Sequence, residues 1–197
     1  MSRRAELRAT VAAIIASDDL EDEHLDDALS WIDSGAAVYR TAKPATPPKH
    51  VVSYSLLVDP VEPAVLLIDH RLSRLWLPAG GHVEPDEAPD VAAARELSEE
   101  LGVDPEPLAP CGRQPFFLTV TPTAGPAPSH VDVSLWYAFA GSAEMSLVVD
   151  EREARAARWW RLDEIEAAAS VGFDPHMARA AAKLARLLAE TSGPASH

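Results

Sequence analysis

Three glutamates lie close together in the sequence, at a spacing that suits metal chemistry. Glu96, Glu99 and Glu100 follow an i, i+3, i+4 pattern, so on a helix they share one face within about 100° of arc. Like charges at this spacing repel one another, and no lysine shares the face to neutralise them. Carboxylate oxygens suit a hard cation such as Mg²⁺ or Mn²⁺, which water and substrate phosphates normally complete. The pattern therefore indicates a cation site, with a solvated acidic helix face as the alternative.

Zinc chemistry is not expected from the sequence. Cys111 is the single cysteine of the chain, and no histidine cluster is evident. His50 and His130 each stand at the entrance of a predicted strand, and we interpret them as edge residues without a role. His82 follows two glycines, and for it we weigh a contact with substrate against a structural role beside a tight turn.

A longer pattern surrounds the three glutamates, from Gly81 to Val103. It reads G-x5-E-x7-R-E-U-x-E-E-x-G-U, where U is aliphatic, and every fixed position is present. The matching residues are Gly81, Glu87, Arg95, Glu96, Leu97, Glu99, Glu100, Gly102 and Val103. Average residue frequencies put a chance match in a chain of this length on the order of 10⁻⁷. The stretch resembles the signature of the Nudix hydrolase family, and no subfamily is assigned.

The resemblance implies a fold, an activity and a metal site. Nudix proteins are α/β proteins, folded as an α/β/α sandwich with a mixed β-sheet, and they hydrolyse nucleoside diphosphates linked to another moiety. In the family the signature glutamates bind divalent metal, which here means Glu96, Glu99 and Glu100. The backbone carbonyl just before the first signature glycine often joins them, so Gly80 is a candidate ligand. We therefore expect Mg²⁺ as cofactor, with Mn²⁺ as a substitute.

The resemblance also assigns a bracing role to other signature residues. Glu87 and Arg95 typically pair to hold the signature loop against the helix, so their expected role is architectural. The predicted structural brace of the site consists of Gly81, Glu87, Arg95 and Gly102.

Hydrolysis of a phosphoanhydride also needs a base for the proton of the attacking water. Family members differ in this base, so Glu96 of the signature is one candidate and an acid from a later loop is the other. Glu151, in the acidic turn 150–153, is the candidate from the later loop. Asp150 and Glu153 compete for this role, and a plain acidic turn is the alternative. The predicted catalytic residues are Glu96, Glu100 and Glu151.

Substrate contacts are harder to place, because specificity depends on loops outside the signature. Aromatic rings can stack on a nucleobase, although core packing is the expected fate of most of them. Trp136 is the best candidate, because it lies on the polar face of its predicted strand, opposite the apolar row. The predicted substrate-binding residues are Trp136 and His82, and the nucleoside diphosphate derivative is not specified.

The charge and hydropathy of the chain exclude several classes of protein. Acidic residues outnumber basic ones by 31 to 17 in the 197 residues, a formal charge of −14, so duplex nucleic acid is not an expected partner. No uninterrupted run of about 18 apolar residues occurs, so no membrane span is expected. The N-terminal apolar stretch is too short for a signal peptide. We expect a cytoplasmic protein.

The apolar periodicity predicts helices first, then strands around a helix, then helices again. Two helices are expected within 3–35, a helix at 89–101, and further helices at 163–169 and 174–190. Strands are expected at 51–59, 64–70, 75–80, 114–121 and 131–141, with a short one at ARWWRL. Three domains follow: a helical extension with a proline-rich arm at 1–49, the Nudix domain at 50–172, and a C-terminal helix with a disordered tail at 173–197.

The N-terminal extension must bury its apolar stripe, either on its own sandwich or on a second subunit, so a homodimer is possible. The leading functional interpretation is a Mg²⁺-dependent hydrolase that cleaves a phosphoanhydride by attack of activated water. The alternative is a non-catalytic ligand-sensing or protein-interaction domain of the same fold. Such domains usually lose signature carboxylates, whereas all are present here.

Overall fold

The central element of the fold is strand β1, Lys49–Asp59, which contacts three other strands along its length. We describe a computed structural model, in which residues 2–43, 46–123, 130–168 and 172–191 are described. The other strands of the eight-stranded sheet are β2 Ala64–His70, β3 Trp76–Leu77, β4 Ala79–His82, β5 Glu106–Pro107, β6 Phe117–Pro122, β7 Val131–Ala140 and β8 Ala154–Arg161. The helices are α1 Arg3–Ala12, α2 Asp19–Asp33, α3 Pro89–Leu101, α4 Leu162–Ala167 and α5 Met177–Thr191.

The sheet is mixed, as expected. β1 runs parallel to β7 over ten residue pairs, from Lys49 opposite Val131 to Val58 opposite Ala140. All other pairings are antiparallel: the end of β1 pairs with β2, and its first half pairs with β4. Strand β1 therefore lies between β7 and β4, and β4 carries Gly81, the first residue of the signature.

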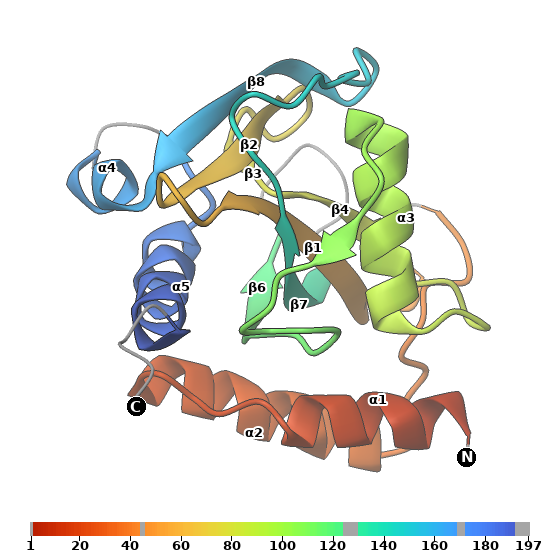
Figure 1. The fold of residues 1–197 in the computed structure, drawn as a ribbon. Coiled ribbons are helices and arrows are strands. Elements are labelled where there is room, and N and C mark those ends of the chain that lie inside the picture. Colours follow the sequence, from red (N-terminus) through yellow and green to blue (C-terminus); the bar gives the residue numbers. More distant parts are fainter. Residues whose placement is uncertain (1, 44–45, 124–129, 169–171, 192–197) are drawn as a thin grey trace.

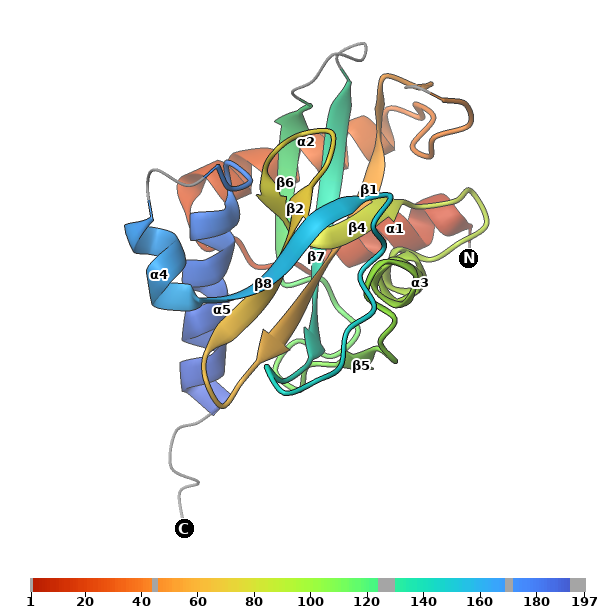
Figure 2. The same cartoon turned by 90° about the horizontal axis from the view of Figure 1, so that it is seen from above.

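Helices cover both faces of the sheet, which makes an α/β/α sandwich (Figures 1 and 2). On one face Leu57 and Tyr137 pack in a cluster with Leu97 of α3. On the other face Leu56 and Trp136 pack in a second cluster with helices α4 and α5. Adjacent residues of β1 and β7 thus point into different clusters, so both faces of these central strands are buried.

The N-terminal helices pack across one end of the sandwich (Figure 1). Leu7, Val11 and Ile32 are almost completely buried and belong to the same cluster as α3. Glu21 of α2 is fully buried, and its carboxylate accepts a hydrogen bond from the ammonium group of Lys183 on α5, at 2.7 Å. The apolar stripe of the extension is therefore covered by its own chain, which removes the observation that suggested a second subunit.

Two expectations about strands were wrong in detail. The segment 75–80 is split into two strands, because Trp76–Leu77 pairs with β2 whereas Ala79–His82 pairs with β1. The expected polar face of strand β7 does not face solvent, since Ser134 and Trp136 are both buried. The SGPASH tail, and parts of the proline-rich arm and of the loop before His130, lie outside the described residues. Within the described part of the chain, no helix is both long and apolar enough to cross a membrane.

Candidate active site

Helix α3 begins and ends where local chemistry requires. Pro89 occupies the first helical turn, where its missing N–H costs nothing, and Gly102 ends the helix in the left-handed region at φ 66°. The expected helix 89–101 is confirmed. Two buried serines of β1 fix the helix on the sheet: the Ser53 hydroxyl donates to the carbonyl of Pro89 and the Ser55 hydroxyl to that of Ala93, each at 2.7 Å.

The signature glycines lie directly against the glutamates of α3. The N–H of Gly80 donates to the Glu100 carboxylate at 2.9 Å. A side chain at Gly81 would overlap the Glu96 carboxylate, and one at Gly80 would overlap the backbone of β1. Glycine is needed at Gly80 because β4 lies so close to the backbone of β1, whereas a side chain at Gly81 would displace the Glu96 carboxylate.

The three glutamates differ in depth. Glu100 is 8% exposed, Glu96 is half-buried, and the side chain of Glu99 is 60% exposed. Burial raises the pKa of Glu100 to about 8, and the negative charges of Glu96, Glu153 and Asp150 add to this against the Gly80 hydrogen bond. Burial also raises the pKa of Glu96, although Arg95 opposes the shift. Among the described residues Glu100 has no ion pair like the one that Arg95 makes with Glu96, so a cation would stabilise its carboxylate.

Arg95 connects the signature loop to the helix. Its guanidinium donates to both carboxylate oxygens of Glu87 at 2.9 Å, and to the carbonyl of His82 at 3.2 Å. It also contacts Glu96 at 2.7 Å and Glu99 at 3.4 Å. The guanidinium hydrogen bonds lower the pKa of Glu87. This geometry matches the bracing role expected for Glu87 and Arg95.

The acidic turn 150–153 lies beside the end of α3. The N–H of Asp150 donates to the carbonyl of Glu100 at 2.8 Å, and the carboxylate of Asp150 is held by Arg152. The charges of Glu153 and Asp150 raise the pKa of Glu100, and the side chains of Glu151 and Glu153 are both exposed. Glu153 therefore lies close enough to Glu100 to affect its charge.

The two predicted substrate contacts lie in different surroundings. Trp136 is completely buried, and its indole N–H donates to the hydroxyl of Thr119 at 3.0 Å. Contrary to the expectation, this ring has no exposed face on which a base could stack, because it is buried with the rings of Tyr54 and Phe117 packed against it. His82 is half-buried next to Gly81, and burial, together with the charge of Arg40, lowers its pKa to about 3.

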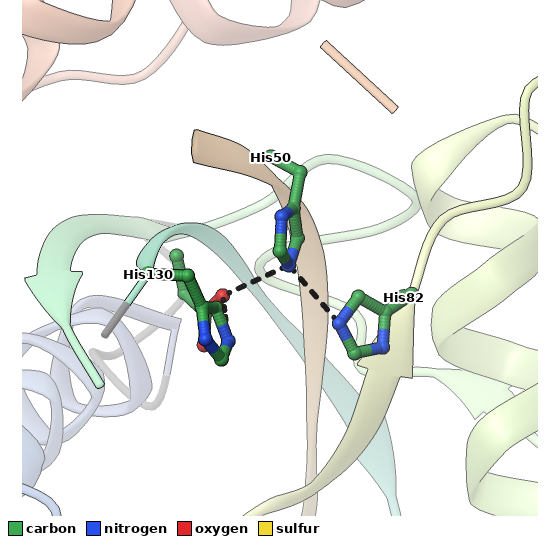
Figure 3. Close-up of side chains that lie close together, drawn as sticks. His50, His82 and His130 are labelled. Carbon is green, nitrogen blue, oxygen red and sulfur yellow. Dashed lines mark hydrogen bonds and ion pairs between the residues drawn. The ribbon is translucent and has the colours of Figure 1, made fainter. Parts of the chain in front are cut away.

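The sequence reasoning missed a histidine cluster, which we define as His50, His82, His130 and Asp132 (Figure 3). The expectation that the chain has no histidine cluster was wrong, since the rings of His50 and His130 lie 5.0 Å apart between centroids. Only the pairing of β1 with β4 and β7 brings these residues together. The one local signal is His130-x-Asp132, in which both side chains share a face of the strand.

A family comparison identifies the fold. The family model described as NUDIX domain matches residues 48–181. The chain belongs to the NUDIX family. No curated protein matches the sequence significantly.

Solved NUDIX structures resemble the chain at low sequence identity. A NUDIX-family hydrolase from Clostridium perfringens is 21% identical, with a TM-score of 0.53 over 73% of this chain and 98% of its own. A Caenorhabditis elegans Ap4A hydrolase is 18% identical, with a TM-score of 0.53 over 71% and 98%. An Escherichia coli dihydroneopterin triphosphate pyrophosphohydrolase is 18% identical, with a TM-score of 0.53 over 75% and 97%. These similarities establish the fold.

Proposed function

We propose that this NUDIX protein is a Mg²⁺-dependent pyrophosphohydrolase that cleaves a phosphoanhydride in a nucleoside diphosphate linked to another moiety. The observation that carries the proposal is the buried Glu100 carboxylate, hydrogen-bonded to Gly80, close to Glu96 and without an ion pair among the described residues. Family membership supplies the reaction class. Mn²⁺ should substitute for Mg²⁺, because both prefer oxygen ligands.

The residues present fit a hydrated divalent cation. Glu96, Glu99 and Glu100, with the Gly80 carbonyl, would hold it, and all of them offer oxygen. The three carboxylates are not gathered into a closed cage, since Glu99 reaches into solvent and Arg95 holds two of them. An open arrangement suits Mg²⁺, which keeps several waters and is completed by substrate phosphates. When bound, such an ion neutralises phosphate charge and lowers the pKa of a bound water.

A carboxylate of the chain must then accept the proton of the attacking water. Glu96 supports this role because its raised pKa gives the carboxylate more affinity for a proton than an exposed glutamate has. The acidic turn offers Glu151 and Glu153 as the other candidates, and the charge of Glu153 raises the pKa of Glu100. Kinetics of Glu96→Gln, Glu151→Gln and Glu153→Gln would separate the three, because loss of the base lowers kcat much more than KM.

The substrate class is proposed from the family, and the particular substrate needs a screen. The similar structures include an Ap4A hydrolase and a dihydroneopterin triphosphate pyrophosphohydrolase. A panel should therefore contain dinucleoside polyphosphates, nucleoside triphosphates, ADP-ribose and nucleotide sugars. Release of phosphate, pyrophosphate and nucleoside monophosphate would identify the bond that is cleaved.

The decisive variant is Glu100→Gln, which keeps the shape of the side chain and removes one ligand charge. Turnover of the best substrate should fall by about two orders of magnitude or more, while the far-UV circular dichroism spectrum stays unchanged. Glu190→Gln, an exposed glutamate on α5, is the matched control and should keep full activity. Near-normal turnover of Glu100→Gln would contradict the assignment.

The alternative is a non-catalytic domain that senses a ligand or binds a protein partner. It predicts binding of a nucleotide without any metal-dependent product release across the panel. The complete set of signature carboxylates favours the enzyme. We also propose a cytoplasmic protein without duplex nucleic acid as partner, which its single cysteine and its charge of −14 support.

A further inference from the structure

The histidine cluster is assembled by sheet register from three strands. His50 lies near the start of β1, opposite Asp132 on β7, and His82 ends β4 opposite Val52 of β1. His130 immediately precedes β7 and lies over the same end of the sheet. Figure 3 shows the His50 ring between the rings of His82 and His130, with a dashed line from His50 to His82. Among the described residues, this is the one group of at least three possible ligands whose ligand atoms all lie within 4.8 Å of one another.

Three of the distances between ligand atoms in the cluster are close to those of a metal coordination sphere. Nε2 of His50 lies 3.1 Å from Nε2 of His82 and 3.3 Å from Oδ1 of Asp132. Nε2 of His130 lies 3.4 Å from the same oxygen. A tetrahedral zinc ion with bonds of about 2.0–2.1 Å separates its ligand atoms by about 3.3–3.4 Å.

The hydrogen-bond partners turn the lone pair of His50 into the cluster. Nδ1 of His50 lies 2.8 Å from the carbonyl oxygen of Pro47. A carbonyl only accepts, so Nδ1 carries the proton and Nε2 of the neutral ring presents its lone pair. Nδ1 of His130 lies 2.9 Å from the hydroxyl of Thr123. Outer partners of this kind normally orient histidine ligands and set their tautomer.

Asp132 supplies an independent indication of a cation site. Its Oδ1 is buried and accepts no hydrogen bond from the described residues. This oxygen and the lone pair of His50 Nε2 are both acceptors, and they face each other at 3.3 Å. A proton can bridge one such contact at a time, whereas a metal ion satisfies all four ligand atoms at once.

We propose that His50, His82, His130 and Asp132 bind one transition-metal ion, with zinc as the best match. Three imidazole nitrogens and one carboxylate oxygen suit zinc and disfavour Mg²⁺, which selects oxygen ligands. The site is distinct from the carboxylate site on α3, although His82 follows Gly80 by two residues and its carbonyl accepts from Arg95. The bound ion connects the starts of β1 and β7 to the signature loop, so its role is to hold this loop in place.

The test uses the untagged full chain, freed of metal with a chelator and then titrated with Zn²⁺ in a calorimeter. We expect one equivalent to bind with a Kd below about 1 µM and to raise the Tm, because metal that binds only the folded state stabilises it. Titration with Co²⁺ should give the strong visible absorption of a tetrahedral site. Asp132→Asn and His130→Gln should each weaken Zn²⁺ binding at least about 100-fold and abolish the increase in Tm.

Two controls make the result specific to the cluster. His24→Gln removes a half-buried histidine on α2 and should leave Zn²⁺ binding unchanged. The double variant Glu96→Gln/Glu100→Gln disables the carboxylate site and should also keep the zinc equivalent, so failure of the proposed hydrolase does not affect this test. Absence of stoichiometric binding, binding that both cluster variants retain, or loss of the zinc equivalent in the glutamate variant would each overturn the proposal.

Discussion

Replacing Glu100 by glutamine should stabilise the metal-free protein at alkaline pH, although it disables the proposed site. Burial raises the pKa of this carboxyl to about 8 in the folded chain. In the unfolded chain the group titrates near its ordinary value of 4.5. The folded state therefore binds more protons than the unfolded state between these two pH values, and stability falls as pH rises through this window.

The size of the effect follows from the pKa difference. The free energy of unfolding should fall by up to about 1.4 kcal/mol per pH unit, so by at most about 4 kcal/mol from about pH 5 to about pH 8. Glutamine cannot ionise, so the variant lacks this loss. Other buried groups titrate too, and only the difference between wild type and variant isolates Glu100.

Urea unfolding in a chelator, at several pH values from about 5 to about 9, measures this difference. The free energy of unfolding of the variant, relative to that of wild type, should increase as pH rises and become constant above about pH 8. Added Mg²⁺ should restore wild-type stability at high pH and have a much smaller effect on the variant. Glu190→Gln should follow wild type throughout. A difference between wild type and Glu100→Gln that stays constant with pH would refute the electrostatic reasoning.

Three further variants test contacts around the site and the extension. Arg95→Ala removes the ion pairs that brace the signature loop, so both Tm and turnover should fall, and calorimetry with activity assays measures the two losses. Gly81→Ala places a methyl group against the Glu96 carboxylate and should weaken Mg²⁺ binding at least about 10-fold in calorimetry. Gly35→Ala is the control: its added methyl group meets no neighbour, so Mg²⁺ binding should stay unchanged. Lys183→Met leaves Glu21 buried without its partner and should cost about 3–5 kcal/mol in urea unfolding; an unchanged free energy would mean that this pair does not fix the extension.

Local chemistry made helix α3 predictable. Pro89 at its first turn and Gly102 after its last each act through their own backbone, so the helix bounds follow from the sequence. The spacing of Glu96 and Glu100 determines that both carboxylates share a face of this helix. The contact of Arg95 with Glu87 spans only eight residues, and the family resemblance anticipated it.

Tertiary packing decided what these patterns could not. The alternation along β7 correctly identified an apolar face, but the other face is buried as well, in a cluster that contains Trp136 together with residues of helices α4 and α5. The depth of Glu100, and hence its raised pKa, depends on how closely β4 approaches α3. The amino-acid sequence pattern does not contain these distances, because they result from the pairing of strands and from the packing of helices on them.

The histidine cluster shows most clearly what the sequence determines and what only the tertiary structure decides. The sequence by itself determined the residue types and the shared face of His130 and Asp132. It separates His50 from Asp132 by more than eighty positions, and only the parallel register of β1 and β7 places them opposite each other. Side chains alternate along a strand, so a shift of one residue in this register would turn His50 and Asp132 to opposite faces of the sheet. Sequence determined the chemistry of the ligands, and strand register determined that they meet.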